Sequence, residues 1–152
     1  MQPILGPALC FGLVCVSLAA VRGDEALYVG GTVTAIPEGT KGRLNLPEGD
    51  AAGFDSKKEQ FSIPYASIES IEYGQKVGRR VGAAVAISPV LLFSKKRKHY
   101  VTIGYRDRDG NRQGAVFELS KGAVRRVIFA LESRSGKTVD LESEDARKHL
   151  GR

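Results

Sequence analysis

The sequence predicts a mainly β domain, in which about seven short strands form a small bent antiparallel barrel or sandwich that one C-terminal amphipathic helix closes. Short runs of alternating apolar and polar residues, separated by turn residues, fill the chain from Leu27 to Leu119. One stretch of helical periodicity follows them, and 152 residues suffice for a single domain with a plain hydrophobic core. The helix needs a surface to cover, and the mouth of a small barrel provides one.

The strands are expected in the order in which the alternation appears. "ALYVGGTVTAI" is predicted to place Leu27, Val29, Val33 and Ala35 on one face, with a bulge or bend at the intervening glycines. "KGRLNL", "AAGFDS", "EQFSIPY" and "SIESIEYG" follow as further short strands, and "HYVTIGYRD" and "QGAVFELS" close the set. Strands are therefore expected to dominate from Leu27 to Leu119.

The helix is expected over about Lys121 to Arg134. Apolar residues recur there at i, i+3, i+4 and i+7, which is the pattern of one buried face. Ser120 is the expected N-cap and Gly136 the expected stop. The buried positions would be Val124, Val127, Ile128 and Leu131.

The chain is expected to divide into a leader, one domain and a tail. Residues 24–135 would form the barrel domain, with an apolar and basic insertion at 76–98, and residues 136–152 would form a charged tail that frays. Residues 1–23 are predicted to be a secretory signal peptide, because a long apolar run without charge precedes small residues. An uncleaved membrane anchor is the alternative, since the apolar run is just long enough to span a bilayer. The protein is therefore expected to be exported, and periplasmic or membrane-associated.

Cysteine and charge exclude several classes of protein. Both cysteines, Cys10 and Cys15, lie in the leader, so the remaining chain has no thiol for a disulfide scaffold or a thiolate zinc site. The net charge of +6 is concentrated in residues 76–98, which hold seven basic residues and no acidic one. One basic segment on a slightly acidic body predicts one binding face rather than a nucleic-acid-binding protein.

The segment 76–98 is predicted to contact a membrane surface. Its apolar part, residues 81–93, would reach about 20 Å as a helix, which is too short to span a bilayer core of about 30 Å. Pro89 and several small residues make a core strand unfavourable. An excursion that leaves and returns on one side remains, with an apolar tip in the lipid interface and basic flanks on anionic headgroups. The alternative is a short helix that folds back on the barrel. The expected contact residues are Arg79, Arg80, Ile87, Val90, Leu91, Leu92, Phe93, Lys95, Lys96, Arg97 and Lys98.

Catalytic and metal-binding chemistry has little support in the sequence. The two histidines, His99 and His149, are far apart, and no serine, histidine and aspartate set has a local signature. "DRDGNRQGAVFE" resembles a calcium loop, but Arg112 occupies the position that requires glycine. The Asp109-Gly110 pair instead predicts a β-hairpin turn. No catalytic residue, metal or cofactor is expected, and the protein is expected not to be an enzyme.

Two stretches resemble a known superfold. "FSIPYASIESIEYG" resembles the strand–turn–strand of pleckstrin-homology-like domains, including bacterial and GRAM-type members, and "VFELSKGAVRRVIFAL" resembles their closing helix. "YVGGTV", "IEYGQKVGRRVGAA", "FSKKRKHYVTIGY" and "AVFEL" are similar to uncharacterised exported bacterial proteins of the acidobacterial type, over most of residues 28–131. The superfold implies a barrel and a helix, whereas its members bind phosphoinositides, peptides or nothing identified.

The expected function follows from the leader, the fold and the insertion together. We expect a non-enzymatic exported domain that contacts a membrane surface through residues 81–93 and their basic flanks. The alternative is a periplasmic protein-interaction or self-association module that uses the same loop. The expected partners are thus anionic lipid or a protein, including a second copy of the chain, and not nucleic acid.

Overall fold

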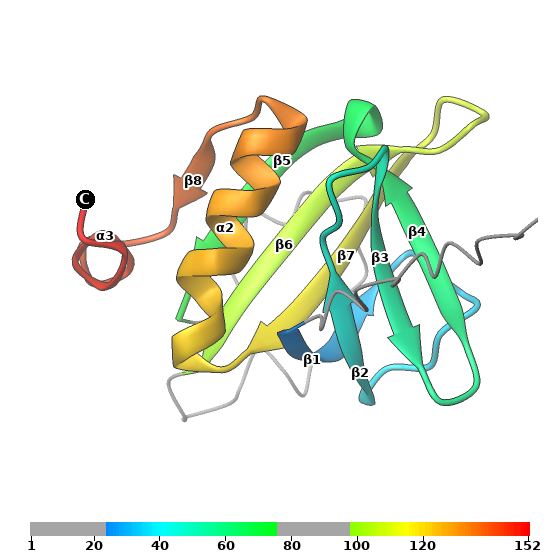
Figure 1. Ribbon diagram of the computed structural model, residues 1–152, viewed down its shortest axis with the longest axis horizontal. Helices are drawn as coiled ribbons and strands as arrows, with labels where there is room; N and C mark the ends of the chain where they lie inside the picture. Colours follow the sequence, from blue (N-terminus) through cyan, green and yellow to red (C-terminus); the bar gives the residue numbers. More distant parts are fainter. Residues whose placement is uncertain (1–23, 76–97) are drawn as a thin grey trace, which may run out of the picture.

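The computed structural model describes residues 24–75 and 98–152, which form a mainly β fold (Figure 1). The elements are β1 (Asp24–Gly31), β2 (Thr40–Asn45), β3 (Ala51–Ser56), β4 (Gln60–Pro64), the 3-10 helix η1 (Tyr65–Ser67), β5 (Ile68–Gly74), β6 (His99–Arg106), β7 (Arg112–Leu119), α2 (Lys121–Ser135), β8 (Val139–Leu141) and α3 (Glu144–Leu150). The mainly β class is confirmed. Within the described residues there are eight strands and two α-helices, rather than about seven strands and one helix.

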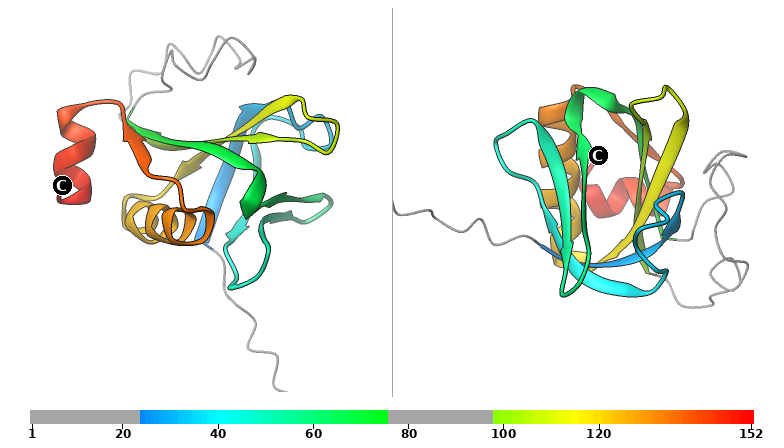
Figure 2. Two further views of the ribbon diagram at one scale, coloured as in Figure 1. Left: turned by 90° about the horizontal axis from the view of Figure 1, so that it is seen from above. Right: turned by 90° about the vertical axis from the view of Figure 1, so that its right-hand side faces the viewer.

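The strands form one open, mixed sheet in the order β4-β3-β2-β1-β7-β6-β5-β8. Strands β1 to β4 make one antiparallel meander and β5 to β7 a second, and the pairing of β1 with β7 joins the two. The last strand, β8, pairs with β5 in parallel, so the sheet is not purely antiparallel as expected. The sheet curves around α2, which contacts η1, β5, β6 and β1 (Figure 2).

Helix α2 buries the face that the periodicity predicts. Its four predicted core residues, Val124, Val127, Ile128 and Leu131, are at most 1% exposed. Gly136 ends the helix in the left-handed conformation, with its N–H donating to the Glu132 carbonyl at 2.9 Å. Ser120 occupies the N-cap position, but its side chain makes no capping hydrogen bond. The helix therefore gains its stability mainly from the packing of its apolar face.

A group of aromatic rings packs together in the main core, against the first meander of strands β1 to β4. Its members are Tyr28, Phe54, Phe61 and Phe117, with neighbouring ring centroids 5.3–6.4 Å apart. The two meanders supply these rings jointly, so the pairing of β1 with β7 and the aromatic contacts stabilise the same junction.

The first strand differs from the sequence expectation. It ends at Gly31 instead of continuing to Ala35, which is exposed, and its register against β7 shifts between Tyr28 and Gly30. Gly31 has φ +146°, and a Cβ there would lie 2.1 Å from the Gly114 carbonyl oxygen. The two glycines were expected to form a bulge or a bend, but alternation alone extended the strand beyond them.

The charged tail does not fray, which corrects the expectation for residues 136–152. It forms β8 and α3, and three of its side chains are buried: Val139 to 6% exposure, Ala146 fully and Leu150 to 8% exposure. Ser143 caps α3 by accepting a hydrogen bond from the Ala146 N–H at 3.2 Å. Arg152 donates to Glu132 of α2 at 2.9 Å, so the end of the chain is held against the helix.

Candidate functional site

The structure describes one of the predicted contact residues, Lys98. Its ammonium lies 2.8 Å from a carboxylate oxygen of Glu118 on β7, and this hydrogen bond is the main cause of a raised Lys98 pKa. Lys98 is thus part of the fold as well as of the basic run. The other predicted residues lie outside the described ranges: Arg79, Arg80, Ile87, Val90, Leu91, Leu92, Phe93, Lys95, Lys96 and Arg97.

The structure does place the two points at which the insertion joins the sheet. The Lys98 N–H lies 3.4 Å from the Gln75 carbonyl oxygen, and Gly74 pairs with Tyr100 in the ladder between β5 and β6. The segment therefore leaves and re-enters the sheet at adjacent positions, at one end of two paired strands. The N–H donates to the carbonyl across this gap, which makes the junction a continuation of the ladder.

A small apolar cluster lies on the sheet face opposite α2. It consists of Val29, Tyr100 and Val116, which are buried, with Leu27 packed against them. Leu27 and Val29 share one face, as the alternation predicts, whereas Val33 packs against the main core instead. Since the three central side chains are at most 3% exposed, this cluster is not a free apolar surface.

The two histidines of the chain lie in contact. The rings of His99, on β6, and His149, on α3, stack with centroids 4.6 Å apart at 27°. The Tyr73 hydroxyl on β5 is hydrogen-bonded to His99 Nδ1 at 2.8 Å, and the Tyr73 ring stacks on His99 with centroids 6.1 Å apart. Three elements thus bring their aromatic side chains together at the end of the sheet where the insertion joins it.

Two cationic side chains of α2, Lys121 and Arg125, lie near this histidine pair. Burial lowers the pKa of His99 most, and electrostatic repulsion from His149 and Lys121 lowers it further. Arg125 of α2 donates to the His149 carbonyl oxygen at 3.0 Å, which ties α3 to α2. Lys121 and Arg125 lie in the first turns of α2, and no acidic residue is present in its first turn. This is the end of a helix where cations are least favourable, so the local charge pattern is not explained by helix stability.

Sequence reasoning missed the histidine pair because it treated the two residues as isolated. His99 follows the basic run and His149 lies in a tail that was expected to fray, so nothing local suggested a contact. The one available signal was that these are the two histidines of the whole chain. Their contact depends on the docking of α3, a helix too short for sequence periodicity to predict.

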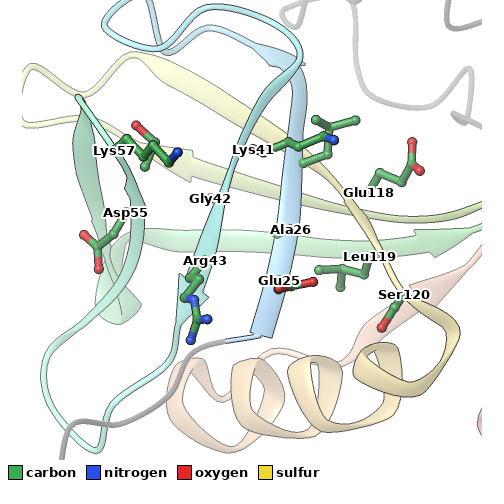
Figure 3. Close-up of a pocket in the computed structure, with 12 residues that line it drawn as sticks. Glu25, Ala26, Lys41, Gly42, Arg43, Asp55, Lys57, Glu118, Leu119 and Ser120 are labelled. Carbon is green, nitrogen blue, oxygen red and sulfur yellow. The ribbon is translucent and has the colours of Figure 1, made fainter.

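A groove of about 760 Å³ lies along β1, β2, β3 and the end of β7 (Figure 3). Its charged lining is balanced, with three basic and three acidic side chains: Lys41, Arg43, Lys57, Glu25, Asp55 and Glu118. Asp55 accepts a hydrogen bond from Asn45, and Glu118 is held by Lys98. Balanced charge on an open groove does not select an anionic or a cationic ligand.

The acidic loop between β6 and β7 is the predicted hairpin turn. Arg106 pairs with Arg112, and Gly110 has φ +82°. The Asp107 carboxylate accepts hydrogen bonds from the Gln113 amide at 2.7 Å and from the Asn111 and Asp109 N–H groups, and these bonds, led by that from Gln113, lower its pKa. The carboxylate therefore organises the turn. Across the residues that the structure describes, no three histidine, cysteine, aspartate or glutamate side chains group together for a metal ion.

Within residues 24–75 and 98–152, no helix is long and apolar enough to cross a membrane. Comparisons with protein-family models, with curated proteins and with solved structures gave no match to this chain.

Proposed function

We propose that this protein is a non-enzymatic exported domain that contacts an anionic membrane surface through residues 81–93 and the basic residues on either side of them. The apolar tip of Ile87, Val90, Leu91, Leu92 and Phe93 would enter the lipid interface. The flanking basic side chains would meet anionic headgroups, each contributing about 1 kcal/mol near the surface. The proposal assigns no reaction and no cofactor to the domain.

The adjacency of Gln75 and Lys98 carries this proposal. A segment that joins the sheet at two hydrogen-bonded positions can send its middle outward and bring it back to the same place. A single straight span would instead separate the two ends by the thickness of the bilayer core, about 30 Å. The geometry of the junction therefore supports contact with one surface and opposes a crossing.

The start of the described domain lies at the same end of the sheet. Ala26 of β1 pairs with Leu119 of β7, and Leu119 pairs with His99 of β6, so the three residues form one row across adjacent strands. With neighbouring strands about 4.8 Å apart, Ala26 lies about 10 Å from His99, the first residue of β6. A signal peptide or anchor in residues 1–23 would thus join the domain on the side that we propose faces the membrane.

The proposal also covers the relationship of this fold to a known superfold. We propose a distant relationship to pleckstrin-homology-like domains, with β8 and α3 as additions to that plan. Two antiparallel meanders followed by a helix that covers the opening of a curved sheet support this relationship. The contribution of the likeness is limited to architecture, because members of one superfold bind different ligands.

Co-sedimentation with vesicles tests the proposal. The protein purified from cells expressing the full chain should sediment with phosphatidylglycerol-containing vesicles, and binding should weaken as salt rises. Replacing Lys95, Lys96 and Arg97 by Gln should weaken binding by about 3 kcal/mol, or roughly 100-fold. Lys98 is kept because its ion pair with Glu118 belongs to the fold.

A tip variant and a matched control separate lipid contact from other roles. Leu91→Ser with Leu92→Ser should abolish sedimentation, whereas Phe129→Ser, which changes a side chain 70% exposed on α2, should leave it unchanged. Light scattering after size-exclusion chromatography measures the mass of the lipid-free protein. Two results together would contradict membrane contact: the parent protein forms a stable dimer but does not bind vesicles, and the tip variant is a monomer. They would show that the loop serves self-association instead.

A further inference from the structure

The histidine pair lies at the foot of the proposed membrane-contacting segment. His99 directly follows Lys98, the last residue of the basic run, so its backbone is within about 4 Å of the run. His149 stacks on it, Lys121 acts electrostatically on His99, and Arg125 donates a hydrogen bond to the backbone carbonyl oxygen of His149. We call these four side chains the histidine cluster.

The histidine cluster is positively charged to an extent that depends on pH. Lys121 and Arg125 are cationic side chains, and each proton added to an imidazole ring of the cluster adds one more positive charge. The pKa of His99 is lowered, chiefly by burial and then by the electrostatic influence of His149 and Lys121, so the neutral ring is favoured when no anion is present. An anion placed against the cluster favours the protonated ring, and binding and protonation therefore strengthen one another.

We propose that the histidine cluster is a second contact for anionic lipid headgroups, one that protonation strengthens. The inference rests on the proposed function, because His99 reaches the surface only if the adjoining segment does. An anionic membrane surface at about −30 mV also concentrates protons, lowering the local pH by roughly 0.5. The surface would thus promote the protonation that strengthens its own contact.

The charges facing the cluster from each packed element fit this assignment. From β5 the neutral Tyr73 hydroxyl contacts His99, and burial raises the pKa of this phenol to about 12, so it does not titrate near neutrality. Glu118 of β7 is held by Lys98. From α3, Arg147 lies 3.4 Å from Glu144, and Lys148 adds a further positive charge. The other acidic side chains of β5, β8, the following turn and α3 do not contribute to the His99 pKa shift: Glu72, Asp140, Glu142 and Asp145.

Vesicle binding as a function of pH tests the inference. Phosphatidylglycerol stays anionic between about pH 8 and about pH 5.5, and histidine is the side chain that ordinarily titrates there. Each added positive charge near such a surface strengthens binding about fivefold, so affinity should rise between about fivefold and 25-fold on acidification. His99→Gln with His149→Gln should retain binding at the higher pH and lose this rise.

A charge variant provides a readout that a purely structural role would not change. Lys121→Gln removes a neighbouring cation, so the pKa of His99, followed by NMR, should move upward towards its usual value. Lys137→Gln removes an equally exposed charge beyond the end of α2 and should leave that pKa unchanged. Adding vesicles should raise the His99 pKa of the parent protein, and inorganic phosphate alone should not.

The possible results distinguish this inference from the proposed function. Vesicle binding that is strong at both pH values without a rise would refute the role of the cluster and leave the membrane contact intact. Absence of binding at every pH would remove both. Binding that weakens on acidification would show that protonation releases α3 instead, and an equal pKa rise with free phosphate would show a phosphate site rather than a lipid contact.

Discussion

The burial of helix α2 gives the most definite prediction for the stability of the protein. Leu131→Ala removes three carbon atoms from a side chain that is 0% exposed. Their transfer to water costs about 2.4 kcal/mol at about 0.8 kcal/mol per carbon, and the remaining cavity raises the total to about 3–5 kcal/mol. This is a large part of the free energy of unfolding of a typical domain, about 5–15 kcal/mol.

Urea denaturation followed by far-ultraviolet circular dichroism measures this loss. With an m-value of about 2 kcal/mol per molar urea, the midpoint should fall by about 2 M. Phe129→Ala on the same helix is the control, because that ring is 70% exposed and its removal should change stability by less than about 0.5 kcal/mol. Equal midpoint shifts in the two variants would refute the assignment of the buried face.

Two further predictions concern the interior of the sheet. Burial raises the pKa of Tyr28 and Tyr73 to about 12, so the neutral phenols favour the folded state, and the free energy of unfolding should decrease as pH rises from about 10 towards 12. Near-ultraviolet absorbance should show these phenols ionising together with unfolding, and their ionisation in a still folded protein would contradict the burial. Gly31→Ala should cost more than about 2 kcal/mol, since its Cβ would collide with the Gly114 carbonyl, whereas Gly49→Ala has open space and should be tolerated. Comparable urea midpoints for these two variants would contradict the tight turn after β1.

The sequence predicted the elements that local signals specify. The apolar positions of α2 recur at the helical period, and the Asp109-Gly110 pair marks the hairpin between β6 and β7. These features depend on residues within a few positions of one another. The alternation also placed Leu27 and Val29 correctly on one face, but it could not foresee the register shift after Tyr28 and the end of β1 at Gly31, beyond which Val33 packs against the main core.

The docked C-terminus and the histidine pair could not be predicted from local sequence signals. Helix α3 spans Glu144–Leu150, is mostly charged, and is ordered by the burial of Ala146 and Leu150 against the rest of the fold. Helices of this length have little stability of their own, so tertiary contacts decide whether they form. The contact between His99 and His149 exists only once α3 is docked, and no local pattern encodes it.

The central claim is that residues 81–93 enter a lipid interface, and a fluorophore at position 91 tests it most directly. Leu91→Cys is labelled with an environment-sensitive dye in a Cys10→Ser and Cys15→Ser background, so that one thiol reacts. The account predicts a blue shift on mixing with phosphatidylglycerol-containing vesicles, and a smaller shift when Lys95 and Lys96 become Gln. An emission spectrum that vesicles leave unchanged at low salt would contradict it.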